Sequence, residues 1–341
     1  MFSMKVTLIS VDLAKNILQF CGVNQACKPA FNKAIKRHKV FEFLAQYPGV
    51  PVAMEACYSS NYWGRELAKR GHEVKLIPPI HVKPFVKGNK NDRNDAFAIA
   101  EAAHRPNLQC VQPRTLEQTD LILHHRLKDR RVKARTALIN QLRGFLSEYG
   151  IAGATGRRPL FASLAELLDD KNNGLTEQAK LVIKDIQEEW KLLDKAIKEL
   201  DKKIERQAIT NESTRRLMTL KGVAHTIATA FAAAVGDGTA YKNGRHCSAN
   251  LGLVPREHSS GGVQKLSGIT KRGNNYLRRL LIQGAWSVLR NADKSNDGLS
   301  KWACSVVERR GKQKAVVAVA NKMARILWAM SYHQRDYNGA R

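Results

Sequence analysis

Val6-Thr7-Leu8-Ile9-Ser10-Val11-Asp12 is an apolar run that ends in a carboxylate, and it predicts a buried strand. A second apolar run at 17–23 lies close behind it, so the two together predict a β-hairpin with residues 12–15 at the turn. Further strands are expected at 52–56 and 74–78, and helices at 62–70 and 92–104. Strands that alternate with helices indicate an α/β layer over the first 110 residues or so.

The rest of the chain predicts helices. Residues 116–149 form one long basic stretch of helical periodicity, and a Gly/Arg-rich break follows at 150–159. Residues 176–206 carry an a/d pattern typical of a coiled coil, namely Ile183, Ile186, Trp190, Leu193, Ile197, Leu200 and Ile204. This helix could pair with the 116–149 helix or with another subunit, and a plain amphipathic helix on a globular core explains the pattern nearly as well. From 211 onward short helices alternate with Gly-rich turns.

The composition favours a polyanionic partner. The 341 residues include 57 Lys and Arg against 30 Asp and Glu, giving a net charge of +27. The excess is strong in residues 211–341, where 22 basic residues face 7 acidic ones, so we expect a nucleic-acid surface there. No apolar run approaches the roughly 20 residues that span a bilayer, so no membrane partner is expected.

The six cysteines have no metal-site spacing. No pair is separated by two residues and no paired histidines accompany them, so a zinc site is not expected. No signal peptide is recognised at the start of the sequence, and free thiols in a cytoplasmic protein are the expectation.

Four acidic residues suggest one metal centre: Asp12, Glu55, Asp92 and Asp95. The first two end apolar strands, where a carboxylate without a partner is costly to hold. The other two are spaced i, i+3 at the start of a predicted helix, so they share one side of it. Convergence of the four would give an oxygen-ligand site for Mg²⁺, with Mn²⁺ as a substitute, and chemistry on nucleic-acid phosphates. Taken singly, each aspartate is weak evidence, because an Asp after a strand is more often a turn or cap residue. N-terminal helix capping is the alternative explanation for Asp92 and Asp95.

A glycine-rich loop supplies a candidate nucleophile. In His258-Ser259-Ser260-Gly261-Gly262 a serine hydroxyl lies on a flexible backbone, although serine needs a base or a lowered pKa to react. His258 is one candidate base, and a metal-bound oxygen is another. Basic residues that would bind the attacked phosphate surround the loop: Arg256, Lys265, Lys271, Arg272 and, further on, Arg278. An ordinary loop serine remains the simpler explanation of the composition.

These motifs together resemble the DEDD-motif transposases of bacterial insertion sequences, which are relatives of the Piv-type DNA invertases. The resemblance spans nearly the whole chain and rests on the segments 11–15, 54–57, 90–96, 251–256, 260–262, 268–274 and 277–278. Two positions depart from the family pattern. Ser10 stands where the family usually has glycine, and Ala224 replaces a second glycine in the turn 221–226.

The resemblance implies both a layout and a mechanism. It implies an RNase H-like, RuvC-type catalytic domain with the long basic helix at 1–150, a coiled-coil region at 151–210 and a C-terminal transposase domain with the serine loop at 211–341. Asp12, Glu55, Asp92 and Asp95 match the metal-binding tetrad. Ser260 matches the serine that becomes joined to a DNA 5′-phosphate, and Ser259 remains the alternative.

The implied partners are donor and target double-stranded DNA, a non-coding guide RNA of the element, called a bridge or seeker RNA, and further copies of the chain as a dimer or tetramer. In the tetramer, the serine of one subunit completes the acidic site of another.

Three other functions stay open at this point. A RuvC-like junction resolvase would hydrolyse DNA with a metal and no covalent intermediate. A site-specific invertase would use the same chemistry but read DNA directly, without RNA. A non-catalytic nucleic-acid-binding protein with a decayed site is disfavoured because all four carboxylates are present.

Overall fold

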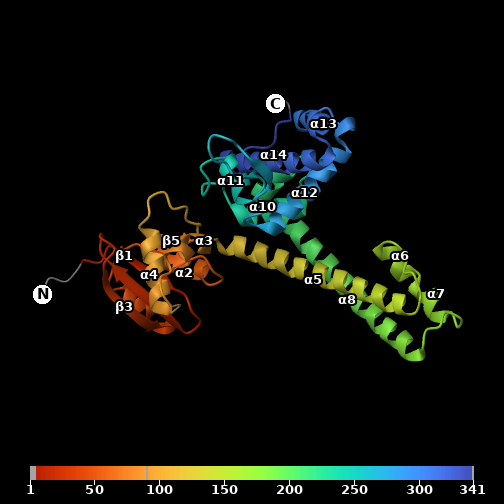
Figure 1. The fold of residues 1–341 in the computed structure, drawn as a ribbon, viewed down its shortest axis with the longest axis horizontal. Helices are drawn as coiled ribbons and strands as arrows, with labels where there is room; N and C mark the ends of the chain where they lie inside the picture. The colour runs from red at the N-terminus through yellow and green to blue at the C-terminus, as the bar shows by residue number, and fades with distance from the viewer. Residues whose placement is uncertain (1–4, 90, 340–341) are drawn as a thin grey trace. The chain divides into compact units, whose positions relative to one another are not determined.

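The computed structural model describes residues 5–89 and 91–339, and it divides into two compact units, 1–116 and 117–341 (Figure 1). The boundary between the two units falls at the start of the long basic helix. Within the described residues, no helix has both the length and the apolar character that crossing a lipid bilayer requires.

Unit 1 is an α/β layer, as the alternating pattern predicts. Its strands are β1 (Leu8–Asp12), β2 (Ile17–Val23), β3 (Pro29–Lys36), β4 (Val52–Glu55) and β5 (Val74–Ile77). They form one mixed sheet in the order β3-β2-β1-β4-β5. β2 is antiparallel to both β1 and β3, while β1, β4 and β5 run parallel. β1, β3, β4 and β5 therefore end at the same edge of the sheet.

Helices cover both faces of this sheet. They are η1 (Arg37–Lys39), α1 (Val40–Leu44), α2 (Ser60–Ala68), α3 (Pro79–Val82), η2 (Lys83–Phe85) and α4 (Asp92–Ala103). Alternate side chains of β1 explain the two layers: Leu8 packs in the core beneath α4, whereas Ile9 and Val11 pack in the core that contains α1 and α2. Ser10 faces α4 and donates a hydrogen bond of 2.6 Å to the carbonyl of Ala96.

Unit 2 begins with two long helices, α5 (Leu116–Glu148) and α8 (Glu177–Thr210), with the short α6 (Arg157–Ala162) and α7 (Leu164–Asp169) between them. α5 and α8 lie antiparallel, side by side (Figure 1). The heptad positions of α8 are buried or partly buried, so this pattern finds its partner within the chain. Paired charges reinforce the contact: Arg135 bonds to Asp194 at 2.5 Å, and Lys128 bonds to Asp201.

The remainder of unit 2 is a helical core. It contains α9 (Glu212–Met218), α10 (His225–Val235), α11 (Gly244–Asn250), α12 (Asn275–Arg290), η3 (Ala292–Lys294), α13 (Gly298–Arg310) and α14 (Lys312–His333). A two-stranded hairpin, β6 (Pro255–Glu257) and β7 (Leu266–Ile269), leaves this core between α11 and α12.

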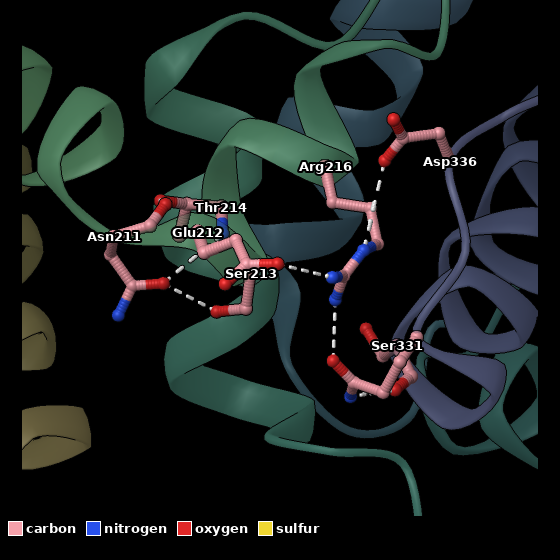
Figure 2. Close-up of polar contacts among 8 residues, drawn as sticks. Asn211, Glu212, Ser213, Thr214, Arg216, Ser331 and Asp336 are labelled. Carbon is pink, nitrogen blue, oxygen red and sulfur yellow. Dashed lines mark hydrogen bonds and ion pairs between the residues drawn. The ribbon is translucent and has the colours of Figure 1, made fainter.

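The final segment of the chain is tied back to α9. Asn211 caps α9 by accepting a hydrogen bond from the amide of Thr214 (Figure 2). Arg216 donates to Glu212 at 2.8 Å and to Gln334, and its guanidinium lies 3.7 Å from a carboxylate oxygen of Asp336 (Figure 2). The segment after α14 is therefore part of the folded unit.

Candidate active site and nucleic-acid interface

The acidic centre forms at one edge of the sheet in unit 1. Asp12 is the last residue of β1 and Glu55 the last of β4, and these strands are parallel neighbours. Asp92 and Asp95 lie in the first turn of α4, which packs across β1. Four carboxylates that are distant in sequence therefore face a common region.

The charges of the other three carboxylates act on Asp12. Burial raises the pKa of Asp12 to about 6, and the negative charges of Asp95, Asp92 and Glu55 add to that rise. A half-buried anion surrounded by three others is unfavourable unless a cation is shared among them. Oxygen ligands of this kind fit a hard divalent ion. Within residues 5–89 and 91–339, no three such side chains are already gathered at metal-coordinating distance.

Hydrogen bonds position α4 against the sheet. Asn91 caps the helix by accepting from the amide of Asn94, which fixes where its first turn begins. Ser10, the departure from the family's glycine, bonds to the carbonyl of Ala96, directly after Asp95. From β3, Asn32 donates to the carbonyl of Arg93 at 3.0 Å. These links, which the sequence did not reveal, hold both helical carboxylates near β1.

The serine loop is the tip of the β6–β7 hairpin in unit 2. Ser260 pairs with Val263 across a two-residue turn, and the intervening Gly261 and Gly262 have φ values of +57° and +77°. Such positive φ angles at both turn positions favour glycine. Every residue from Pro255 to Gly268 is exposed, so the tip is accessible to a ligand.

The two candidate serines have different surroundings. The Ser259 hydroxyl donates to Glu257 at 2.6 Å, and it accepts from the amide of Lys265 at 3.3 Å. This hydrogen bond lowers the pKa of Glu257. The Ser260 hydroxyl has no hydrogen-bond partner within the described chain, and neither does the imidazole of His258. Glu257, the last residue of β6, was not foreseen as the partner of Ser259.

The basic residues around the loop fall into two classes. Four of them are exposed, and none is ion-paired within the described residues: Arg256, Lys265, Lys271 and Arg272. Arg278 differs because it is 7% exposed and donates to the carbonyls of Leu251 and Arg272, at 2.9 and 2.7 Å, and to Asn275. Arg278 therefore joins the two ends of the hairpin segment, and its contact with a nucleic-acid phosphate stays a prediction.

Comparisons with known proteins identify the family. Residues 214–298 match the model described as "Transposase IS116/IS110/IS902 family", and residues 9–151 match a DEDD model described as "Transposase". The chain belongs to this transposase family. The two matches contain the serine hairpin and the acidic centre, respectively, and members of the family are enzymes that cleave and rejoin DNA.

Several relatives match this chain over nearly its full length. It is 42% identical to the transposase for insertion sequence element IS1111A of Coxiella burnetii, over 98% of this chain and 92% of the relative. A probable family 20 transposase of Pseudomonas aeruginosa is 40% identical over 98% and 99% of the two chains. The pilin gene-inverting protein of Moraxella bovis is 23% identical over 98% of each. The resemblance to DEDD transposases is thus confirmed, together with the distant link to an invertase.

Proposed function

We propose that this transposase cuts DNA at the acidic centre of unit 1 and joins the cut 5′-phosphate to a serine of the hairpin. The observation that carries the proposal is the position of the four carboxylates, at the ends of the parallel strands β1 and β4 and in the first turn of α4. There burial raises the pKa of Asp12, and the negative charges of the other three carboxylates add to that rise. An RNase H-like, RuvC-type fold for unit 1 agrees with the mixed sheet order β3-β2-β1-β4-β5, in which β2 alone runs against its neighbours.

Asp12, Glu55, Asp92 and Asp95 would together hold the divalent ion, Mg²⁺ or Mn²⁺. When bound, such an ion polarises the phosphodiester and stabilises negative charge that develops on it. Partial burial of Asp12 keeps the surroundings of the site low in dielectric, where electrostatic effects are strongest.

Ser260 is the proposed nucleophile. Its oxygen bonds to phosphorus as the bond to the 3′ oxygen breaks, giving a 5′-phosphoserine and a 3′-hydroxyl that takes up the serine proton. Because the number of phosphate ester bonds is conserved, the strands can rejoin without ATP. The exposed side chain of Ser260 and the nearby cations Arg256 and Lys265 support this assignment. The carboxylate partner of Ser259 favours that serine instead, so both must be tested.

The test is a denaturant-resistant protein–DNA adduct, formed by the full chain on end-labelled DNA from the element's termini with Mg²⁺. Ser260→Ala should abolish the adduct, while Ser259→Ala should keep it. Asp12→Asn should also remove cleavage yet leave DNA binding largely intact. An adduct that persists in Ser260→Ala and disappears in Ser259→Ala would move the nucleophile by one residue. Cleavage by the wild type with no adduct would support a junction resolvase.

We also propose that a guide RNA from the element selects the DNA sites and that subunits assemble as a dimer or tetramer. Support comes from the family resemblance and from the net charge of +27, which suits a protein that reads backbones while base pairing reads sequence. Sequencing RNA that co-purifies from the native locus is the test. Bulk RNA that moderate salt removes would favour direct reading of DNA.

A further inference from the structure

A groove lies beside the acidic centre on unit 1. It comprises two adjoining cavities of about 650 and 620 Å³ that share Asn16 and Arg37. One cavity is bordered by the loop that follows Asp12 and by the loop that follows Glu55, at residues 13–16 and 57–59. The other is bordered by the end of β3 and by α2. Since β1, β3 and β4 end at the same edge, the groove and the acidic centre are neighbours.

The lining of this groove is basic. It includes Lys15, Lys36, Arg37 and His38, and neither cavity has an acidic lining residue. The three Lys and Arg side chains are exposed, and within the described residues none lies within ion-pair distance of a carboxylate. Positive charge without an internal partner favours binding of an external anion such as a phosphate.

The lining is also aromatic. The side chain of Tyr58 is 91% exposed and that of Tyr62 is 44% exposed, so neither belongs to the core. The Arg37 guanidinium lies 5.0 Å from the ring centre of Trp63 and 5.9 Å from that of Tyr62. Trp63 is buried beneath it, and its indole N–H has no acceptor within the described chain. Exposed rings beside cations that have no carboxylate partner within the described residues are the combination that binds single-stranded nucleic acid.

The larger cavity of unit 2, about 1160 Å³, lacks this character. Its cations are mostly neutralised by the protein itself: Asp129 pairs with Lys133 and Arg279, and Asp297 pairs with Lys221. The groove of unit 1 therefore favours binding of an anionic ligand more than the cavity of unit 2 does.

We infer that the groove binds unpaired nucleotides of the DNA strand adjoining the scissile phosphate. Bases stack on Tyr58 and Tyr62, while Lys15 and Arg37 bind the flanking phosphates. The inference deepens the proposed function, because it relies on the neighbouring carboxylates being the cleavage site. Such a groove would help cleavage, because local unpairing of the DNA bases lets the backbone of one DNA strand reach the acidic centre at the edge of the sheet.

The test measures binding of fluorescein-labelled oligothymidylate, about 12 nucleotides long, to the full chain carrying Asp12→Asn, which prevents cleavage. Tyr62→Ala and Tyr58→Ala should each weaken binding about 5- to 150-fold, because one stacked base contributes about 1–3 kcal/mol. Tyr62→Phe keeps the ring and should bind normally. Tyr332→Ala is the matched control, since this tyrosine is 48% exposed but lies in unit 2.

Two further measurements identify the ligand. Binding of a duplex of the same length should be unaffected by the tyrosine variants, and Lys15→Ala should lower the salt dependence of single-strand binding by about one phosphate contact. Equal binding of the single strand by Tyr62→Ala and Tyr62→Phe would overturn the inference. So would a loss confined to an RNA oligonucleotide, which would assign the groove to RNA.

The adduct assay separates the failure of this inference from that of the proposed function. If the wild type forms a Ser260-dependent adduct but the tyrosine variants bind oligothymidylate normally, the groove proposal fails and the chemistry stands. If the tyrosine variants lose binding while the wild type forms no adduct, the groove stands and the serine mechanism fails. Thermal unfolding by circular dichroism should match between the alanine and phenylalanine variants.

Discussion

Arg278→Ala should destabilise unit 2 far more than the same change at the adjacent Arg279. The buried guanidinium of Arg278 donates to two backbone carbonyls and to Asn275. Removing it leaves both carbonyls without their charged donor, at a cost of about 1–3 kcal/mol each. We therefore expect a loss of about 2–6 kcal/mol of unfolding free energy. Arg279 pairs with Asp129 near the surface, with its own side chain 45% exposed, so its loss should cost about 0–1 kcal/mol.

Urea unfolding, followed by circular dichroism at neutral pH, measures the difference through the shift in midpoint at unchanged slope. Arg278→Lys should fall between the two alanine variants, because an ammonium group keeps the charge but cannot reproduce the planar fork that reaches both carbonyls. Limited trypsin digestion adds a local readout. Opening the base of the hairpin should speed cleavage at Lys265 in Arg278→Ala but not in Arg279→Ala. Equal midpoint shifts for the two alanine variants would refute the claim that the hydrogen bonds of Arg278 stabilise the hairpin segment.

Three other predictions concern the same unit. Burial, followed by the charge of Lys128, lowers the pKa of His125 to about 4, so the unfolded chain binds the proton more readily. Stability present above pH 6.5 should thus fall by roughly 3 kcal/mol toward pH 4, and His125→Gln should flatten that slope in urea titrations. Gly284→Ala should lower the free energy of unfolding and the melting temperature, because the added Cβ would lie 2.5 Å from a backbone oxygen. Gly144→Ala, in open space within α5, should instead raise the free energy of unfolding by about 0.5–1 kcal/mol and with it the melting temperature. Burial raises the pKa of Asp297, but hydrogen bonds from Lys221 and Ser300 outweigh it and lower that pKa to about 2. The stabilisation is present above about pH 4 and lost toward pH 2, so Lys221→Met should show a smaller acid loss than the wild type.

The strongly periodic parts of the fold were predictable from the sequence. The first hairpin, the short parallel strands and the long helices occur close to where the apolar pattern places them, because burial on one face dictates that pattern. Strand β3 was missed. It begins with Pro29, is largely exposed and lies at the sheet edge, so pairing with β2 rather than its own pattern defines it.

At the site, the sequence supplied the residue types but not the contacts. Convergence of the acidic residues was foreseeable, because strand ends and a helix start were each recognisable. The burial of Arg278 and the exposure of Arg279 could not be predicted, because adjacent arginines look alike until it is known which face of the helix is buried. That face is set by Leu277, Leu281 and Val288, which are buried and place Arg278 on the inner face. Tertiary packing therefore decides which cations are structural.

Net charge alone does not locate a nucleic-acid-binding surface. α5 is rich in basic residues, yet Lys128 and Arg135 bond to carboxylates of α8, and Arg131 donates to a backbone carbonyl there. These charges hold two helices together, and a phosphate would have to compete with an internal partner for them. Within the described residues, the exposed cations of the hairpin and of the groove beside Asp12 have no carboxylate partner, although Arg37 donates to the backbone carbonyl of Lys15 at 3.4 Å. Each can therefore gain a new ion pair without breaking one. Unpaired charge, rather than total charge, therefore favours these two places as the proposed DNA-binding surfaces.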